Sequence, residues 1–183
     1  MAAICVFCAS SSTLDQKWLD LATRTGEEIG ARGHTLVSGG GCVGMMGAVA
    51  DGARAGGAHT LGVIPQSLVD LEVADRASDE LIVTGDMGSR KNIMIDRSDA
   101  FITLPGGLGT LDELFEVWTT GILDLHDKPI VLLDPDGFYD GLLAWLGQLA
   151  DTAFVRSSAL DRVIVAKSIG SALDAIEERV TGA

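Results

Sequence analysis

The chain has few basic residues and no long apolar run, and each shortage excludes a class of partner. It carries 13 Lys and Arg against 26 Asp and Glu, which gives a formal net charge of −13. Binding to DNA or RNA needs a basic surface that displaces counterions from the phosphates, so no polymeric nucleic acid is expected as a partner. No apolar run approaches the roughly 20 residues that span a bilayer, so no membrane partner is expected either.

Cysteine is also scarce. Three cysteines, Cys5, Cys8 and Cys42, do not suggest a disulfide framework in a chain of 183 residues. Cys5 and Cys8 fall within a predicted strand, where residues three apart point to opposite faces, so we expect them to pack in the core. The three histidines are scattered without ligand spacing, and we expect no metal. No basic segment precedes the first apolar run, which argues against a signal peptide and favours a cytoplasmic protein.

Short apolar runs alternate with segments of helical spacing along the whole chain. Strands are expected at 3–8, 35–37, 59–64, 81–84, 100–104, 129–133 and 162–165, with helices between them and a final helix at 169–180. This alternation predicts a single Rossmann-like domain over residues 1–183, a three-layer α/β/α fold with a central parallel sheet covered on both faces. In such folds ligands bind at the carboxyl ends of the strands.

The most informative stretch is a glycine-rich turn within residues 105–113. It joins the end of the predicted 100–104 strand to the start of a helix, where free backbone N–H groups and the helix dipole favour an anion. We therefore predict that phosphate binds here and that Glu113 points at the group attached to it. Thr110 and Glu113 also fit a capping box, but capping alone would not require three glycines in the turn (Gly106, Gly107 and Gly109).

A second glycine-rich turn has the spacing of a dinucleotide fingerprint, Gly39-x-Gly41-x-x-Gly44. The pattern follows the second strand instead of the first. The next strand also lacks the acidic residue that would bind a ribose. Both facts weaken the case for a dehydrogenase, but a phosphate or ribose contact from this loop is expected. Neither turn continues as a Walker A sequence, so ATP hydrolysis has no support. We expect no cofactor.

Arg90 and Lys91 lie near the start of a predicted helix, where the helix dipole disfavours positive charge. They could be solvated surface residues. Alternatively, they face phosphate, ribose or the Glu113 carboxylate, a role that the planar guanidinium of Arg90 suits. Three large side chains near these motifs are expected in the core or in a pocket wall: Met45, Met46 and Trp118.

Over nearly its whole length the chain resembles the Lonely Guy family of cytokinin riboside 5′-monophosphate phosphoribohydrolases, which are often labelled "lysine decarboxylase". The resemblance rests on Ser38-Gly39-Gly40-Gly41-x-x-Gly44-Met45-Met46-Gly47, Met87-x-x-Arg90-Lys91 and Pro105-Gly106-Gly107-x-Gly109-Thr110-x-x-Glu113. It implies hydrolysis of the N-glycosidic bond of a purine nucleoside 5′-monophosphate, with N6-modified AMP favoured, to free base and ribose 5-phosphate. A decarboxylase has no support, because no lysine lies in a recognisable cofactor-binding context.

The resemblance also assigns residues. Arg90 and Glu113 would be the catalytic pair, and substrate contacts would come from Glu72, Lys91, Gly107, Leu108, Gly109, Thr110, Leu111, Asp112 and Thr119. From the residues themselves, we add the polar turn at Ser10 and the second glycine turn, at Gly40, Gly41, Gly44 and Met45. The chain departs from the family pattern at Gly88-Ser89 and at Leu108. These departures affect the expected base preference more than the expected reaction.

The chemistry agrees with this assignment. Breaking a glycosidic bond builds positive charge on the sugar. Glu113 would stabilise that charge or orient water, and Arg90 would position Glu113 and lower its pKa, keeping it ionised. The resemblance further implies a homodimer, with the helix of Trp118 facing the partner. The rival from another class is a nucleotide or molybdenum-cofactor carrier on the same fold, which would not need the Arg90–Glu113 pair.

Overall fold

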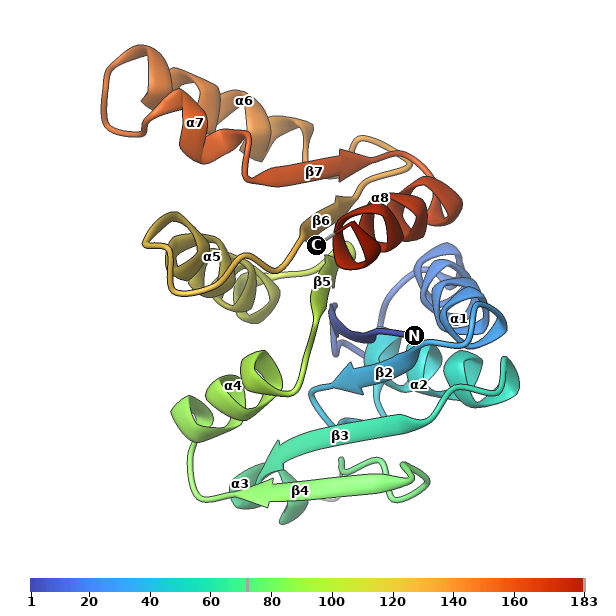
Figure 1. The fold of residues 1–183 in the computed structure, drawn as a ribbon. Helices are drawn as coiled ribbons and strands as arrows, with labels where there is room; N and C mark the ends of the chain where they lie inside the picture. Colours follow the sequence, from blue (N-terminus) through green and yellow to red (C-terminus); the bar gives the residue numbers. More distant parts are fainter. Residues whose placement is uncertain (72, 183) are drawn as a thin grey trace.

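The computed structural model describes residues 1–71 and 73–182, and it contains a seven-stranded sheet in which all pairs are parallel. The spatial order is β4-β3-β2-β1-β5-β6-β7. The strands are β1 (Ala3–Phe7), β2 (Thr35–Ser38), β3 (Thr60–Pro65), β4 (Glu80–Thr84), β5 (Ala100–Thr103), β6 (Ile130–Leu133) and β7 (Val163–Ala166). The predicted fold class is confirmed, because helices cover both faces of the sheet (Figure 1).

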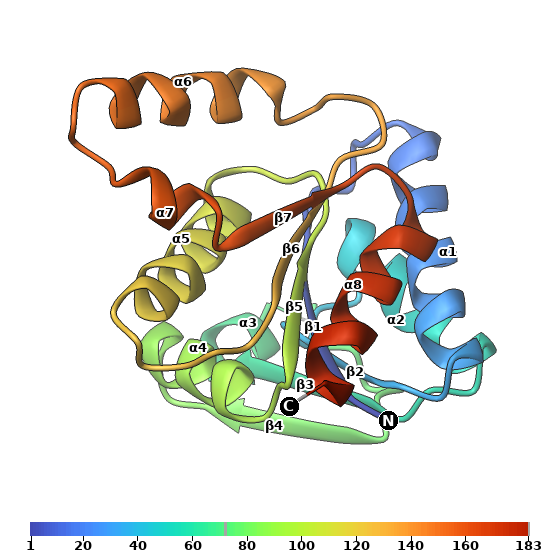
Figure 2. The same ribbon diagram turned by 45° about the horizontal axis from the view of Figure 1, so that its top comes forward.

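Most helices lie where the apolar spacing predicts them. They are α1 (Gln16–Ala31), α2 (Gly44–Ala55), α3 (Gln66–Val69), α4 (Met87–Asp96), α5 (Leu108–Ile122), α6 (Asp140–Asp151), α7 (Ser157–Leu160) and α8 (Ile169–Thr181). In Figure 2, α1, α2 and α8 lie on one side of the sheet, and α4 and α5 on the other. The sequence did not predict α3 and α7, since four residues make barely one turn and show no periodicity.

The sheet divides the core into two clusters, and β1 contributes to both because its side chains alternate. Ile4 and Val6 pack in the cluster under α1, α2 and α8, whereas Cys5 and Phe7 pack in the cluster under α4 and α5. Cys8 belongs to the first cluster, so the prediction that Cys5 and Cys8 pack on opposite faces is confirmed.

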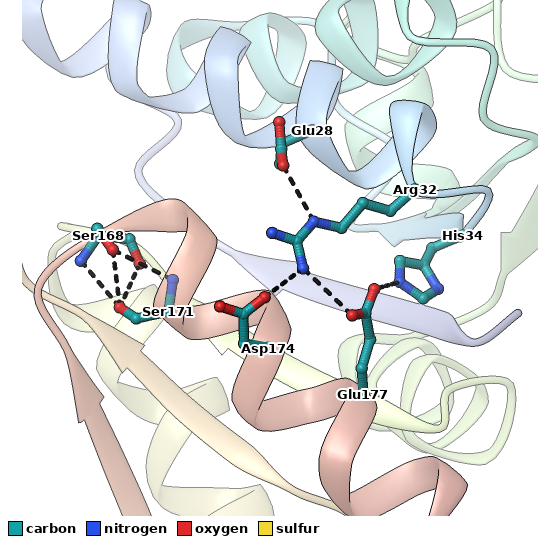
Figure 3. A network of polar contacts seen from close by, with 7 residues as sticks. All are labelled: Glu28, Arg32, His34, Ser168, Ser171, Asp174 and Glu177. Carbon is teal, nitrogen blue, oxygen red and sulfur yellow. Dashed lines mark hydrogen bonds and ion pairs between the residues drawn. The ribbon is translucent and has the colours of Figure 1, made fainter.

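An ion-pair network ties the end of α1 to α8 (Figure 3). Nη1 of Arg32 lies 2.6 Å from Oδ1 of Asp174 and 3.2 Å from Oε2 of Glu177, while its Nε bonds Glu28 within α1. His34 accepts a hydrogen bond from the backbone N–H of Ala2 through Nδ1, and its Nε2 contacts Glu177. The network therefore ties the end of α1 to α8 through Arg32, and the residue before β1 to the turn between α1 and β2 through His34.

Strand order determines where a ligand can bind. The chain passes from β1 outward to β2, β3 and β4, then returns to place β5 on the other side of β1. The loops after β1 and β5 consequently diverge to opposite faces and leave a crevice at their carboxyl ends. Within the described part of the chain, no helix is long and apolar enough to cross a membrane.

Candidate active site at the carboxyl ends of β1 and β5

A hollow of about 350 Å³, here called the polar hollow, lies at this crevice. Its walls come from the loop after β1, from Met46 of α2 and Leu68 of α3, from α4, and from the first turns of α5. Among the predicted site residues, those that line it are Ser10, Arg90, Gly107, Leu108, Gly109, Thr110 and Glu113. Both members of the predicted catalytic pair therefore share one cavity with the start of α5.

Each of the three guanidinium nitrogens of Arg90 has a hydrogen-bond acceptor within the protein. Only 5% of Arg90 is exposed. Its Nη1 lies 3.0 Å from Oε1 of Glu113, its Nε donates to the carbonyl of Val63 at 3.0 Å, and its Nη2 donates to the carbonyl of Gly39 at 3.4 Å. The alternative that Arg90 is a solvated surface residue is thus wrong.

Glu113 lies at the wall of the polar hollow with 11% of its side chain exposed. Burial raises the pKa of its carboxyl above the ordinary value of 4.5, and the charge and hydrogen bond of Arg90 lower it by less. The prediction that Arg90 lowers the pKa was right about the effect of Arg90. It was wrong about the net direction, because the cost of removing the carboxylate from water is larger.

The glycine turn before α5 brings backbone close to the polar hollow. Helix α5 begins at Leu108 with Gly107 as its N-cap, and no side chain caps it. Thr110 is therefore inside the first turn, and the capping-box alternative is wrong. The N–H groups of this first turn lack partners four residues earlier in the helix, so they are free to bind an anion. A Cβ on Gly106 would overlap the side chain of Thr110, whereas Gly107 and Gly109 have open space beside them.

Lys91 lies outside the lining of the polar hollow. Its Nζ is 2.6 Å from Oε2 of Glu116 and 2.9 Å from Oδ2 of Asp112, and these two carboxylates raise its pKa. The pair of contacts ties α4 to α5. Lys91 therefore supports the helices that carry Arg90 and Glu113, and with 18% of its side chain exposed it is not a freely solvated residue.

The glycines of the second turn do not line the polar hollow. Gly40 and Gly44 have φ angles of +69° and +62°, which favour glycine. A Cβ on Gly44 would lie 2.5 Å from the carbonyl oxygen of Ser11, so this glycine lets the loop after β1 approach α2. Met45 is in the core and Met46 lines the hollow, as predicted.

Several other predicted contacts also lie away from the hollow. Among the described residues, those predicted as substrate contacts that do not line it are Gly40, Gly41, Gly44, Met45, Lys91, Leu111, Asp112 and Thr119. Glu72 lies outside the described residues. Sequence reasoning did not assign Cys8, Ala9, Ser11, Leu68 or Met87 to the site. Of these, Met87 could have been predicted from the Met87-x-x-Arg90-Lys91 motif, and Ser11 from its place next to Ser10 in the polar turn.

A second cavity, here called the apolar hollow, adjoins the polar one. It has a volume of about 300 Å³ and shares Ala9, Ser11 and Gly107 with its neighbour. Its larger walls are Leu14, Trp18, Met45 and Phe138. The rings of Trp18 and Phe138 meet edge to face with centroids 5.6 Å apart. An apolar group attached to a ligand in the polar hollow could lie against them.

No group of three or more His, Cys, Asp or Glu among the described residues could hold a metal ion. The polar hollow as described presents one carboxylate, that of Glu113, one guanidinium, that of Arg90, and the backbone N–H groups at the start of α5. This set suits binding of an anion and stabilisation of a positive charge.

Comparisons with known proteins agree with these motifs. A family described as "Possible lysine decarboxylase" matches residues 46–176. A cytokinin riboside 5′-monophosphate phosphoribohydrolase of Mycobacterium tuberculosis is 56% identical over 172 residues, which cover 94% of this chain and 91% of the relative. One of Arabidopsis thaliana is 42% identical over 177 residues, 97% of this chain and 83% of the relative.

Solved structures share the fold at lower identity. The molybdenum cofactor carrier protein of Chlamydomonas reinhardtii is 25% identical with a TM-score of 0.74, covering 99% of this chain and 98% of that one. The molybdenum cofactor binding protein of Rippkaea orientalis is 26% identical with a TM-score of 0.74, covering 97% and 96%. Because the sequence relatives are far more similar and span nearly the whole chain, the protein belongs to the Lonely Guy family of cytokinin riboside 5′-monophosphate phosphoribohydrolases.

Proposed function

We propose that this protein hydrolyses the N-glycosidic bond of purine nucleoside 5′-monophosphates and releases the free base and ribose 5-phosphate. One observation carries the proposal. The buried Arg90–Glu113 pair lies in the same hollow as the glycine-rich start of α5, so a carboxylate and an anion site are within reach of one nucleotide. Relatives up to 56% identical, named as enzymes of this reaction, support it further.

The geometry suggests how each part acts. The 5′-phosphate binds the N–H groups at Gly107–Thr110, where the helix dipole favours its charge. Glu113 then faces the sugar and stabilises the positive charge that develops as the bond from C1′ to the base breaks. Water adds to C1′ as a hydroxyl group, and the proton that it loses goes to the departing base, which leaves as the neutral purine. Arg90 holds the Glu113 carboxylate in place through Nη1.

The apolar hollow supports the finer substrate choice, an AMP whose N6 amine carries an apolar group such as isopentenyl. Trp18, Phe138 and Leu14 offer such a group contact beside the polar hollow. Burying an apolar group of this kind contributes about 25 cal/mol per Å² removed from water. The homodimer and the cytoplasmic location stay predictions from the sequence. Trp118 itself is buried and donates to the carbonyl of Ala159, so any partner would meet other residues of α5.

A direct assay tests the proposal. The protein is incubated with AMP and with isopentenyladenosine 5′-monophosphate, and free base and ribose 5-phosphate are quantified by chromatography. We expect both products in equal amounts, faster release from the isopentenyl substrate, and much slower release from adenosine, which lacks the phosphate. Tight AMP binding without any base release would contradict the proposal and favour the carrier alternative, whose fold this chain shares.

A further inference from the structure

We propose that Gly39 is a positioning residue: its missing side chain provides the space in which the Arg90 guanidinium lies, and through Arg90 it fixes the Glu113 carboxylate. This inference rests on the proposed function for its catalytic consequence, but not for its geometry. It concerns the glycine that opens the Gly39-x-Gly41-x-x-Gly44 pattern, a residue outside the lining of the polar hollow as the structure describes it.

The first argument is where the guanidinium is bound. Two of its three nitrogens donate to backbone carbonyls, Nε to Val63 and Nη2 to Gly39, and only Nη1 is left for Glu113. The Gly39 carbonyl lies just after β2, and the Val63 carbonyl lies within β3. These two strands are neighbours in the sheet. We call these two carbonyls and the space over the Gly39 Cα the arginine seat. A planar guanidinium group that is hydrogen-bonded through three nitrogens cannot rotate without losing a bond.

The second argument is steric. A Cβ added to Gly39 would overlap Nη2 of Arg90 and would lie 3.0 Å from its Cζ and 3.0 Å from Sδ of Met46. The side chain of Arg90 could not keep its present position. Because all three of its nitrogens are hydrogen-bonded, the guanidinium could move away from the added Cβ only by breaking or lengthening at least one of those bonds. The arginine seat therefore exists only because residue 39 has no side chain.

The third argument is that backbone conformation does not explain this glycine. Gly40 and Gly44 have positive φ angles, but Gly39 does not, so its backbone would accept alanine. Gly40 has a complementary role, since a Cβ there would lie 3.0 Å from Cβ of Ile64 and 3.1 Å from the backbone nitrogen of Val63. Gly40 thus lets β2 end close to β3, which brings the two carbonyls of the seat together.

Gly39→Ala tests the proposal. We expect kcat for base release to fall about 100-fold, as for a displaced catalytic group, with a smaller change in KM. A second readout does not depend on activity. In ¹³C NMR of protein labelled at glutamate carboxyls, with Glu113 assigned by its absence in Glu113→Gln, the pKa of Glu113 should be higher in Gly39→Ala than in wild type. The sign follows because Arg90 lowers that pKa and would be displaced.

A double-mutant cycle separates the seat from a general disturbance. In an Arg90→Ala background, Gly39→Ala should change neither kcat nor the Glu113 pKa further. Arg90→Lys lacks the Nη atoms that the new Cβ would meet, so Gly39→Ala should be tolerated in that background even if it fails to fold alone. Gly147→Ala, the same change in open space on α6, is the matched control.

The outcomes divide clearly. An unchanged Glu113 pKa in folded Gly39→Ala, or equal effects of Gly39→Ala with and without Arg90, would overturn the arginine seat. If wild type released no base, the proposed function would fail, while the NMR titration would still decide whether Gly39 positions Arg90.

Discussion

Nη1 of Arg90 lies 3.0 Å from Oε1 of Glu113, and the two side chains are only 6% and 11% exposed. They come from different helices, α4 and α5, whose first turns face the same hollow. A buried ion pair is sensitive to the loss of either partner, because the other charge is left without compensation. Both the stability and the activity of each variant at this pair must therefore be measured.

Glu113→Gln should remove base release while leaving the nucleotide site intact. The amide keeps the shape of the side chain and can still accept a hydrogen bond from Arg90, but it carries no charge to stabilise the developing oxocarbenium. We expect kcat to fall at least about 100-fold, typical for loss of one electrostatic group. AMP should still bind in calorimetry with an affinity within about threefold of wild type, because the phosphate contacts are backbone groups.

The matched control is Glu116→Gln, the same change less than one turn further along α5. Glu116 contacts Lys91 and does not line the polar hollow as described. It should retain wild-type kcat. Turnover in Glu113→Gln equal to that of Glu116→Gln would remove Glu113 from the mechanism.

The pH dependence of activity should report the raised pKa of Glu113. The carboxylate acts when ionised, so kcat/KM falls as the pH drops through this pKa. Because burial raises it, the acidic limb should lie above the ordinary value of 4.5. Arg90→Ala should move the limb further upward, since Arg90 lowers the pKa. A limb at or below 4.5 in wild type would contradict this assignment.

Stability should change with pH in the opposite sense. A carboxyl whose pKa is higher in the folded than in the unfolded state contributes its stabilisation fully below the unfolded value. The protein loses that stabilisation as the pH rises through the pKa of the carboxyl in the folded state. From about 4.5 upward to the folded-state pKa, wild type should lose free energy of unfolding relative to Glu113→Gln. Urea denaturation of both proteins across a pH series measures the difference.

The sequence predicted the sheet because its strands are short, continuous apolar runs, as expected for strands buried on both faces. It predicted the turn before α5 from its glycines. It could not predict that Arg90 is buried, because a lone Arg-Lys pair near a helix start looks the same whether solvated or enclosed. The pKa of Glu113 was misjudged for the same reason: the pattern reveals the neighbouring charge but not the depth of burial, and burial is the larger effect.

Glycine roles were equally hard to separate from the sequence. Gly106 and Gly109 are close neighbours in one motif, yet only Gly106 is packed against a side chain, that of Thr110. The pattern Gly39-x-Gly41-x-x-Gly44 indicated a ligand loop, whereas Gly40 and Gly44 adopt positive φ and serve close backbone approaches. Spacing alone does not distinguish a glycine that admits a ligand from one that admits another part of the chain.

This difference predicts opposite effects of two alanine substitutions. Gly106→Ala would place a Cβ 2.5 Å from Cβ of Thr110, so it should lower the free energy of unfolding by about 1–3 kcal/mol, as overpacking does. Gly109→Ala meets nothing within 4 Å and lies in a helix, so it should raise stability by up to about 1 kcal/mol.

Gly109→Ala should nevertheless impair the substrate site. Gly109 lines the polar hollow, and an added methyl group there would hinder the approach of phosphate to the backbone. We expect KM for AMP to rise about tenfold, which corresponds to about 1.4 kcal/mol of binding free energy. Urea denaturation and steady-state kinetics on the same preparations separate the two effects. Equal stability of both variants, or an unchanged KM in Gly109→Ala, would show that the two glycines do not divide their roles in this way.

The apolar hollow predicts a change in substrate preference when its aromatic wall is removed. Phe138→Ala truncates a ring that is 48% exposed and so contributes little to the core. The ratio of kcat/KM for isopentenyladenosine 5′-monophosphate to that for AMP should fall about tenfold, within the range for losing apolar contacts in a pocket. AMP itself should be hydrolysed nearly as before, because it has no group to reach Trp18 or Phe138.

Trp145→Ala provides the control for this experiment, since Trp145 is an exposed aromatic on α6 that lines neither hollow as described. It should leave the preference ratio unchanged. Trp18→Ala should lower the preference ratio as Phe138→Ala does. Because Trp18 also packs against the core, the melting temperature of the Trp18→Ala variant must be measured as well. If both aromatic truncations slowed AMP and the isopentenyl substrate by the same factor, the apolar hollow would support the loop after β1 and would not bind the N6 substituent.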